Sequence, residues 1–261
     1  KSMDRIKKCL KGTLGIEDSM TVSTYKKLCN DFETEVTDII ESSRILKSDD
    51  EVKSIKKAIE IAESSLLNTD ISGTENKVAA ELEYNMRIKE SMKPAFETIV
   101  ASGIRSSLPH ATVSSHNLEK PVVVDWGAVW NNYCSDTTRT IIESERHTEI
   151  FEIVLEAQKK AIKVIKPGIK ASYVDKVARD IIGEYGYADS FIHSTGHGLG
   201  LEVHEKPSIS KNDQSKLQKG MVITVEPGIY IKGEFGVRIE DVIHVKNRST
   251  VLNKMKKKLD F

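Results

Sequence analysis

Apolar residues recur at helical spacing in several stretches of the chain. The clearest run follows Ser48-Asp-Asp-Glu51, which has the spacing of a helix-capping box, and it places Val52, Ile55 and Ile59 on one face. The same spacing is found in three later stretches. Further helices are therefore predicted at 74–90, 145–165 and 172–185.

From residue 95 onward, other segments are rich in β-branched and aromatic residues and are separated by turn residues, which is typical of strands. The predicted strands are 96–102, 121–130, 133–142, 191–204, 221–231 and 236–245. Helices, strands, helices and strands thus follow one another along the chain. This order predicts an α+β fold built from two similar halves.

The amino-terminal part of the chain is predicted to be a separate piece. Residues 1–68 are expected to be helical apart from a turn at 12–15, with one helix beginning near Thr24. A domain boundary is predicted near Arg44–Ser48. The division is therefore 1–46 and 47–261.

The two halves contain one matching segment. Val122-Val-Val-Asp-Trp-Gly-Ala-Val-Trp130 aligns with Ile223-Thr-Val-Glu-Pro-Gly-Ile-Tyr-Ile231, so that an acidic residue has the same place in both. Each segment is followed by a second acidic residue on the next predicted strand. The four acids are Asp125, Asp136, Glu226 and Glu240. Because charge among apolar residues is costly without a partner, we interpret the four as one functional cluster.

Turn residues predict how these acids face each other. Asn131-Asn132 is expected to form a two-residue turn, which makes the two acids of the first half diagonal neighbours on one face. Gly127 is expected to leave open space beside one of them. In the second half, a five-residue loop at 232–236 would bring Ile231 opposite Val237 and give the other two acids the same relation.

Four carboxylates in one cleft repel each other unless cations compensate their charge. Two divalent ions would balance the four negative charges. Oxygen-rich ligation with one imidazole suits Mn²⁺, Co²⁺, Fe²⁺ or Zn²⁺. A pair of such ions can share a water molecule and lower its pKa toward neutrality, which yields a hydroxide nucleophile. The cluster therefore predicts a hydrolytic metal centre.

Histidines concentrate in one segment, where three of the seven lie at His193, His197 and His204. Glycines flank the middle one and are expected to let the backbone come close to an ion or substrate. We predict that His197 is the imidazole ligand and that the outer two bind or protonate substrate. Arg238 and His110 are further candidates for holding substrate, although a structural ion pair is an equal interpretation of Arg238.

Charge and hydropathy narrow the class of protein. The 261 residues contain 39 Lys+Arg and 39 Asp+Glu, so no net field would draw the chain to nucleic acid. The longest apolar stretches are shorter than the ~20 residues that a membrane helix needs. Three scattered cysteines favour reduced thiols and a cytoplasmic location. The basic run Lys254–Lys258 is expected to be a solvated, frayed end.

Together, five segments resemble the "pita-bread" metallopeptidases. They are Asp125-Trp-Gly-Ala, Tyr133-Cys-Ser-Asp136-Thr-Thr-Arg-Thr140, His193-Ser-Thr-Gly-His197-Gly-Leu-Gly-Leu-Glu-Val-His204-Glu, Val225-Glu-Pro-Gly-Ile-Tyr230 and Val237-Arg-Ile-Glu-Asp241. The family comprises prolidase (Xaa-Pro dipeptidase), aminopeptidase P, methionine aminopeptidase and creatinase. Arg44-x-x-Lys47-Ser48-x-x-Glu51 and the last segment favour its proline-directed branches, with Xaa-Pro dipeptidase the nearest.

The resemblance implies a role for each candidate residue. Two metal ions, with Mn²⁺ or Co²⁺ favoured over Zn²⁺ or Fe²⁺, would be held by Asp125, Asp136, His197, Glu226 and Glu240. Asp136 and Glu240 would bridge them. The catalytic residues would be Glu226, His204 and His193, and the substrate-binding residues would be His110 and Arg238.

The resemblance also implies a pita-bread fold, small peptide substrates with proline at the second position, and a homodimer. The charge balance and the short apolar stretches predict no nucleic-acid or membrane partner. Proline-directed members carry a separate N-terminal domain, so residues 1–46 are expected to be the remnant of a truncated one. Three alternatives remain at this point. They are aminopeptidase P, methionine aminopeptidase, and a non-catalytic binding module on the same fold.

Overall fold

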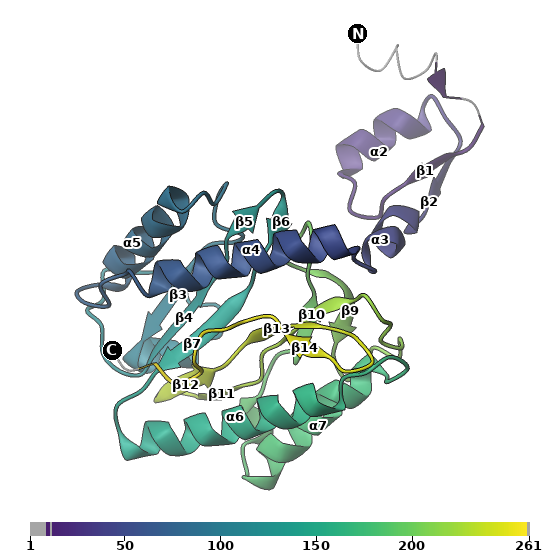
Figure 1. Ribbon diagram of the computed structural model, residues 1–261. Coiled ribbons are helices and arrows are strands. Elements are labelled where there is room, and N and C mark those ends of the chain that lie inside the picture. The colour runs from purple at the N-terminus through teal and green to yellow at the C-terminus, as the bar shows by residue number, and fades with distance from the viewer. Residues whose placement is uncertain (1–8, 11, 260–261) are drawn as a thin grey trace. The chain divides into compact units, whose positions relative to one another are not determined.

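The computed structural model describes residues 9–10 and 12–259, and the chain divides into two compact units, Lys1–Arg44 and Ile45–Phe261. Figure 1 labels their helices and strands. Within the described residues, every helix is too short or too polar to span a bilayer. The identification of residues 1–46 as the remnant of another domain stays a prediction.

The first unit contains two short parallel strands, β1 (Leu14–Ile16) and β2 (Thr34–Val36), and two helices, α2 (Val22–Cys29) and α3 (Ile39–Arg44). The prediction that this region is helical apart from a turn at 12–15 was therefore wrong, and its part on residues 1–8 and 11 lies outside the described residues. In the short segment Thr34–Val36, Thr34 and Val36 are β-branched, which favours strand pairing over helix. The helix expected near Thr24 is α2, which Thr21 caps by accepting from the Thr24 backbone N.

The first half of the second unit packs two helices on a three-stranded sheet. α4 (Asp49–Leu66) and α5 (Glu75–Ile88) cover the antiparallel sheet of β3 (Ile99–Ser102), β4 (Val122–Trp126) and β7 (Thr137–Ile141). The predicted capping box at α4 is confirmed, since Ser48 and Glu51 each accept from the other's backbone N. The buried Trp126 side chain donates from Nε1 to the Ala62 carbonyl at 2.8 Å and so fixes helix to sheet.

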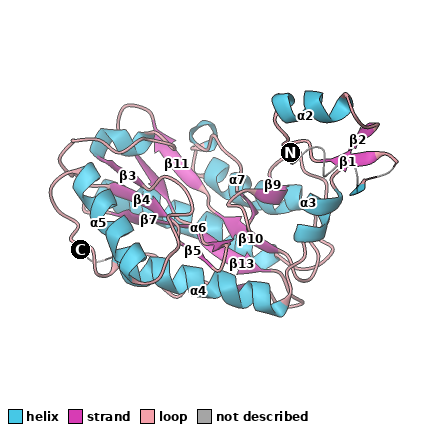
Figure 2. Ribbon diagram, turned by 90° about the horizontal axis from the view of Figure 1, so that it is seen from above, coloured by secondary structure: helices cyan, strands magenta, loops and turns pink. Residues whose placement is uncertain are grey.

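The second half repeats this layering. α6 (Glu145–Val164) and α7 (Ala171–Glu184) lie against a sheet whose order is β14 (Thr250–Val251), β13 (Asp241–His244), β10 (Val222–Val225), β8 (Gly196–Gly198) and β9 (Glu205–Ile209). In this unit the strands lie between α4 and α5 on one side and α6 and α7 on the other (Figure 1, Figure 2). The prediction of one continuous strand over 191–204 was wrong, because only the glycine-rich 196–198 segment pairs.

Each half contains one long hairpin that is interrupted midway. In the first, β4 continues into β5 (Val129–Trp130), and β6 (Tyr133–Cys134) leads into β7. Asn131 and Asn132 have φ of 49° and 67°, which is the two-residue turn expected from the sequence. The pairs Trp130↔Tyr133 and Asp125↔Thr138 confirm the predicted register.

The second hairpin differs from the prediction. β10 continues into β11 (Gly228–Ile231), and β12 (Phe235–Arg238) leads into β13, but Ile231 pairs with Phe235 instead of Val237. The loop has three residues rather than five, because Gly233 adopts a φ of 80° that allows a tighter turn. In the resulting register Val225 pairs with Asp241, and Glu226 and Glu240 follow as direct rather than diagonal neighbours.

Candidate metal centre and active site

The four predicted acids lie where the two hairpins are interrupted. Asp125 is near the end of β4 and Asp136 immediately precedes β7, while Glu226 immediately follows β10 and Glu240 immediately precedes β13. The backbone N of Glu240 donates to the Thr138 carbonyl at 3.1 Å, which joins the second half to the first at this point. The interruptions therefore bring acids from both halves to one place.

His197 completes the cluster. Its Nε2 is 3.3 Å from Glu226 Oε1 and 3.5 Å from Asp136 Oδ2. Asp136, His197 and Glu240 offer ligand atoms that all lie within 4.8 Å of one another. His197 Nδ1 lies 3.0 Å from the Gly198 carbonyl, which can only accept, so Nδ1 carries a proton, and Nε2, the nitrogen that faces the acids, is the one that can give up its proton to bind a cation.

The pKa values of the clustered acids indicate that the cluster binds positive charge. Burial raises the pKa of Asp125 to about 7, against the effect of Arg238, and burial with the neighbouring acids raises the pKa of Glu240 well above its usual value. Burial alone would raise the pKa of Glu226 and lower that of His197. Their contact outweighs burial, so the pKa of Glu226 falls to about 2 and that of His197 rises. The acids thus cannot all ionise cheaply among themselves.

Unpartnered oxygens show that divalent cations fit this site. Asp125 Oδ2 accepts from Arg238 Nη2 at 2.7 Å and Glu240 Oε2 accepts from Thr138 Oγ1 at 2.8 Å. The other oxygen of each carboxylate, Asp125 Oδ1 and Glu240 Oε1, is buried without a hydrogen-bond partner. Buried carboxylate oxygens of this kind, beside the Nε2 of an imidazole, form a donor set suited to hard or borderline divalent ions.

Arg238 reaches the site, but its nitrogens contact protein groups. Its buried side chain donates from Nη2 to Asp125, from Nη1 to the Tyr230 hydroxyl at 2.7 Å and the Pro109 carbonyl at 3.1 Å, and from Nε to Thr138 Oγ1 at 3.1 Å. This pattern favours the structural ion pair that the sequence left as an equal interpretation. Substrate binding by Arg238 stays a prediction.

Thr138 and Tyr230 are contacts that the sequence analysis missed. Thr138 donates to Glu240, and the buried Tyr230 hydroxyl lies between Arg238 and His193. Burial raises the pKa of Tyr230 to about 12, so the hydroxyl keeps its proton. The sequence offered one signal for them, their short separation from two of the acids. Thr138 is two residues after Asp136, and Tyr230 is four residues after Glu226.

The other histidines surround the cluster. His193 Nδ1 lies 2.8 Å from the Ser194 carbonyl and must donate to it, so His193 Nε2 accepts from Tyr230 at 2.8 Å. The His204 ring centroid is 4.3 Å from that of His197. Partial loss of hydration and the nearby His197 lower the pKa of His204, which favours its neutral form. His110 is exposed but close enough to lower the pKa of both His193 and His204.

Gly127 and Gly198 were expected to leave space for an ion, and this expectation was wrong. A Cβ at Gly127 would collide with the Ser135 carbonyl oxygen, and one at Gly198 would collide with the Lys206 carbonyl oxygen. The space is filled by backbone of the neighbouring strand. These glycines are therefore required for close strand pairing beside the cluster.

Residues of the Arg44-x-x-Lys47-Ser48-x-x-Glu51 motif tie α4 to the site. Lys47 Nζ forms a buried ion pair of 2.8 Å with Glu205 Oε2, next to His204 in the chain. Glu51 Oε1 accepts from the Tyr133 hydroxyl at 2.7 Å, in the hairpin that carries Asp136. The start of α4 thus contacts a segment of each half.

Two similar halves that bury carboxylates and an imidazole between them are the architecture of a metallopeptidase. The model of metallopeptidase family M24 matches residues 53–247, and the chain belongs to this family. Membership confirms the expected pita-bread fold and peptidase class, and it implies divalent metal ions.

Particular relatives are proline-directed enzymes. The chain is 49% identical to "Xaa-Pro dipeptidase" of Pyrococcus horikoshii, over 99% of this chain and 78% of the relative. It is 46% identical to "Xaa-Pro dipeptidase" of Pyrococcus furiosus, over 99% and 79%. The solved prolidase from Pyrococcus furiosus superposes with a TM-score of 0.92 at 46% identity, over 98% of this chain and 80% of that one. X-Pro aminopeptidase from Thermotoga maritima gives 0.90 at 38% identity, over 99% and 79%.

Metal affinity is expected to fall as the pH is lowered from about 8 to about 6, because protons compete with cations for the ligands. Burial raises the pKa of Asp125 to about 7, and the pKa values of Glu240 and His197 are also raised, so bound cations must displace protons near neutral pH. Calorimetric titration with Mn²⁺ in two buffers of different ionisation enthalpy measures the affinity and the protons released. An affinity that stays constant over this range would contradict the prediction.

Proposed function

We propose that this chain is an Xaa-Pro dipeptidase that hydrolyses the bond between an amino-terminal residue and proline, and that it uses two divalent metal ions. The observation that carries the proposal is the meeting of Asp136, His197 and Glu240 within 4.8 Å, with Glu226 beside them. The identity of 49% to an Xaa-Pro dipeptidase supports the substrate class. Mn²⁺ or Co²⁺ is favoured because most of the donors are oxygens.

Five residues would hold the ions, with Asp136 and Glu240 shared between the two. The full proposed ligand set is Asp125, Asp136, His197, Glu226 and Glu240. Divalent ions in such a site lower the pKa of a water molecule and polarise a carbonyl group. The side chains of the protein would then orient the substrate and transfer protons.

Glu226 is proposed to carry the proton. The contact with His197 lowers its pKa, which favours the ionised carboxylate, the form that can accept a proton from the attacking water. It would then return that proton to the proline nitrogen as the peptide bond breaks. Its backbone N donates to the Thr195 carbonyl at 2.8 Å, which fixes the residue at the end of β10.

The histidines are proposed to act on the substrate. Neutral His204 can donate to the oxygen of the scissile carbonyl as negative charge develops there. His193 would contact the substrate while Tyr230 holds its ring, and exposed His110 would bind from the rim. Arg238 would bind substrate only with a donor left over from Asp125 and Tyr230, so we propose that its main effect is to hold Asp125 in place.

Proline suits this chemistry because its tertiary amide has no N–H to donate and its ring fixes the chain direction. The site can therefore select proline by shape while leaving no amide donor unpaired. A cytoplasmic location and a homodimer complete the proposal. Free thiols at Cys9, Cys29 and Cys134 support the location, and sedimentation analysis tests the dimer.

A substrate panel separates the proposed function from its rivals. Gly-Pro and Met-Pro should be hydrolysed faster than Met-Ala-Ser and Arg-Pro-Pro, with Mn²⁺ or Co²⁺ giving higher turnover than Zn²⁺. Initial rates with each ion, measured by release of the amino-terminal residue, provide the check. Fastest cleavage of Met-Ala-Ser would show a methionine aminopeptidase instead, and no cleavage of any peptide would favour a binding module.

Aminopeptidase P is the second candidate, favoured by the TM-score of 0.90 to an X-Pro aminopeptidase. It predicts that Arg-Pro-Pro is the best substrate. The two activities differ in whether chain beyond proline is accepted, so the ratio of the Arg-Pro-Pro and Met-Pro rates decides between them.

A further inference from the structure

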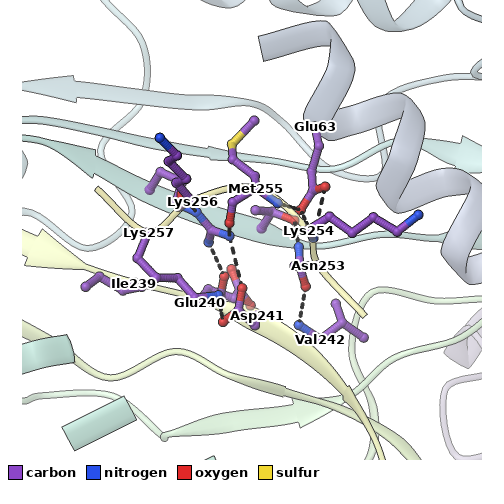
Figure 3. Close-up of polar contacts among 12 residues, drawn as sticks. Glu63, Ile239, Glu240, Asp241, Val242, Asn253, Lys254, Met255, Lys256 and Lys257 are labelled. Carbon is purple, nitrogen blue, oxygen red and sulfur yellow. Dashed lines mark hydrogen bonds and ion pairs between the residues drawn. The ribbon is translucent and has the colours of Figure 1, made fainter. Parts of the chain in front are cut away.

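The segment after β14, residues 252–259, crosses the strands that carry the shared acids, and we call it the strap. In Figure 1 it is the last yellow stretch of the chain. The backbone N of Leu252 donates to the Val242 carbonyl at 2.8 Å, and Leu259 is buried in the core of the first half. The expectation of a frayed end at Lys254–Lys258 was wrong, because side chains and carbonyls of this stretch bond to buried groups (Figure 3).

Asn253 links one strand from each half. Its Oδ1 accepts from the Val242 backbone N at 2.7 Å, and its Nδ2 donates to Thr137 Oγ1 at 2.9 Å. Thr137 in turn donates to the Asp136 carbonyl at 2.7 Å. A single buried amide thus spans from the residue that follows Asp136 to β13, which begins directly after Glu240.

Arg139 extends the same link. Its fully buried guanidinium donates from Nη1 to the Glu240 carbonyl at 2.5 Å and from Nη2 to Asp241 Oδ1 at 3.0 Å. From the strap, the Lys256 carbonyl accepts from Nε at 3.0 Å and the Met255 carbonyl accepts from Nη2 at 3.2 Å. The strap therefore accepts from Nε and shares Nη2 with Asp241, while Nη1 donates to the carbonyls of Thr138 and Glu240.

Lys257 supplies the second positive charge. Its Nζ contacts Asp241 Oδ2, which also accepts from Gln158 Nε2 at 3.1 Å. Asp241 is fully buried and follows Glu240 directly, so its position fixes where the Glu240 backbone lies. Figure 3 shows Lys257 and Asn253 directed from the strap toward Asp241 and Val242.

We propose that the strap is a positioning element of the metal centre, in which Asn253 and Lys257 hold Asp136 and Glu240 at the separation that the cations require. The side-chain bonds that Asn253 and Lys257 form, to Thr137, Asp241 and Val242, all end within two residues of one of these acids, and the two acids come from different halves. Groups that orient metal ligands from behind are worth roughly 10- to 100-fold in metal affinity. This inference rests on the proposed ligation by Asp136 and Glu240.

Two variants and a matched control test the proposal. Lys257→Met and Asn253→Ala should each weaken Mn²⁺ binding by roughly 10- to 100-fold, the cost of disturbing residues behind metal ligands. Lys254→Met is the control, because Lys254 lies in the same strap but its side chain forms an exposed ion pair with Glu60. The measurement is the Mn²⁺ dissociation constant of the full metal-free chain by calorimetry, with the melting temperature recorded on the same samples.

The outcomes are distinct. Lys257→Arg should restore the affinity, since it retains a cation beside Asp241. If both variants lower the melting temperature but keep the wild-type dissociation constant, the strap only supports the fold and the proposal is overturned. Asn253→Ala removes no charge. If Lys257→Met does not fold, the Mn²⁺ dissociation constant of Asn253→Ala alone therefore tests the proposal. Failure of the wild-type chain to bind any divalent ion would overturn the metal centre itself, and the strap's role with it.

Discussion

Replacing Glu226 by glutamine is expected to lower turnover of Gly-Pro by about 100- to 10,000-fold, the usual contribution of a general acid–base group. Glutamine has nearly the same shape but cannot accept the proton of the attacking water. Glu226 Oε1 lies 3.3 Å from His197 Nε2, and this contact lowers the pKa of Glu226, which favours the ionised carboxylate that accepts a proton. The check is kcat at saturating Mn²⁺, with bound metal measured on the same sample to separate proton transfer from metal loss.

The matched control is Glu234→Gln, in the exposed loop between β11 and β12. It makes the same chemical change in the same hairpin, away from the cluster, and should leave turnover unchanged. Turnover of Glu226→Gln within ten-fold of wild type, with metal retained, would show that another group carries the proton.

Replacing Arg139 by methionine is expected to lower the free energy of unfolding of the metal-free chain by about 3–5 kcal/mol, as for other buried ion pairs that lose one partner. The Arg139 and Asp241 side chains are both fully buried and 3.0 Å apart. The substitution also removes donors from the carbonyls of Thr138, Glu240, Met255 and Lys256. Urea denaturation followed by circular dichroism measures the loss.

Arg146→Met serves as the comparison, because Arg146 pairs with Glu149 at 2.9 Å on the surface. Exposed pairs are worth less than about 1 kcal/mol, so this variant should unfold close to the wild-type midpoint. Equal losses for the two arginines would mean that burial of the Arg139 pair contributes no special stability.

Local signals predicted the first hairpin correctly. Asn131 and Asn132 tolerate the positive φ that a two-residue turn demands, and this fixed the register at Asp125 and Asp136. Ser48 and Glu51 likewise predicted the start of α4. The two residues of a capping box lie within one helical turn, so their spacing can be recognised in the sequence. The matching segments of the two halves predicted that the four acids form one cluster, whereas His197 was predicted to join them from the glycines that flank it in the histidine-rich segment.

Features that depend on distant parts of the chain could not be predicted in this way. The predicted register of the second hairpin was wrong by two residues. The residues around Gly233 are compatible with a three-residue loop and with a five-residue loop, so the sequence does not distinguish the two. The predominantly polar first unit was expected to be helical, but β1 and β2 pair across the intervening helix. The strap was taken for a frayed end because its partners, such as Asp241 and Thr137, are known only once the strands are in place.

Sharing the acids between two interrupted hairpins has a consequence for biosynthesis. In a growing polypeptide Asp125 and Asp136 emerge before His197, Glu226 and Glu240, so under the proposed ligation the ions would be captured only after the second hairpin has been translated and has docked. A ligand that binds only the finished protein stabilises it by an amount that rises with the logarithm of its concentration. With the proposed ions as ligands, a higher metal concentration would therefore stabilise the folded protein as well as load the site.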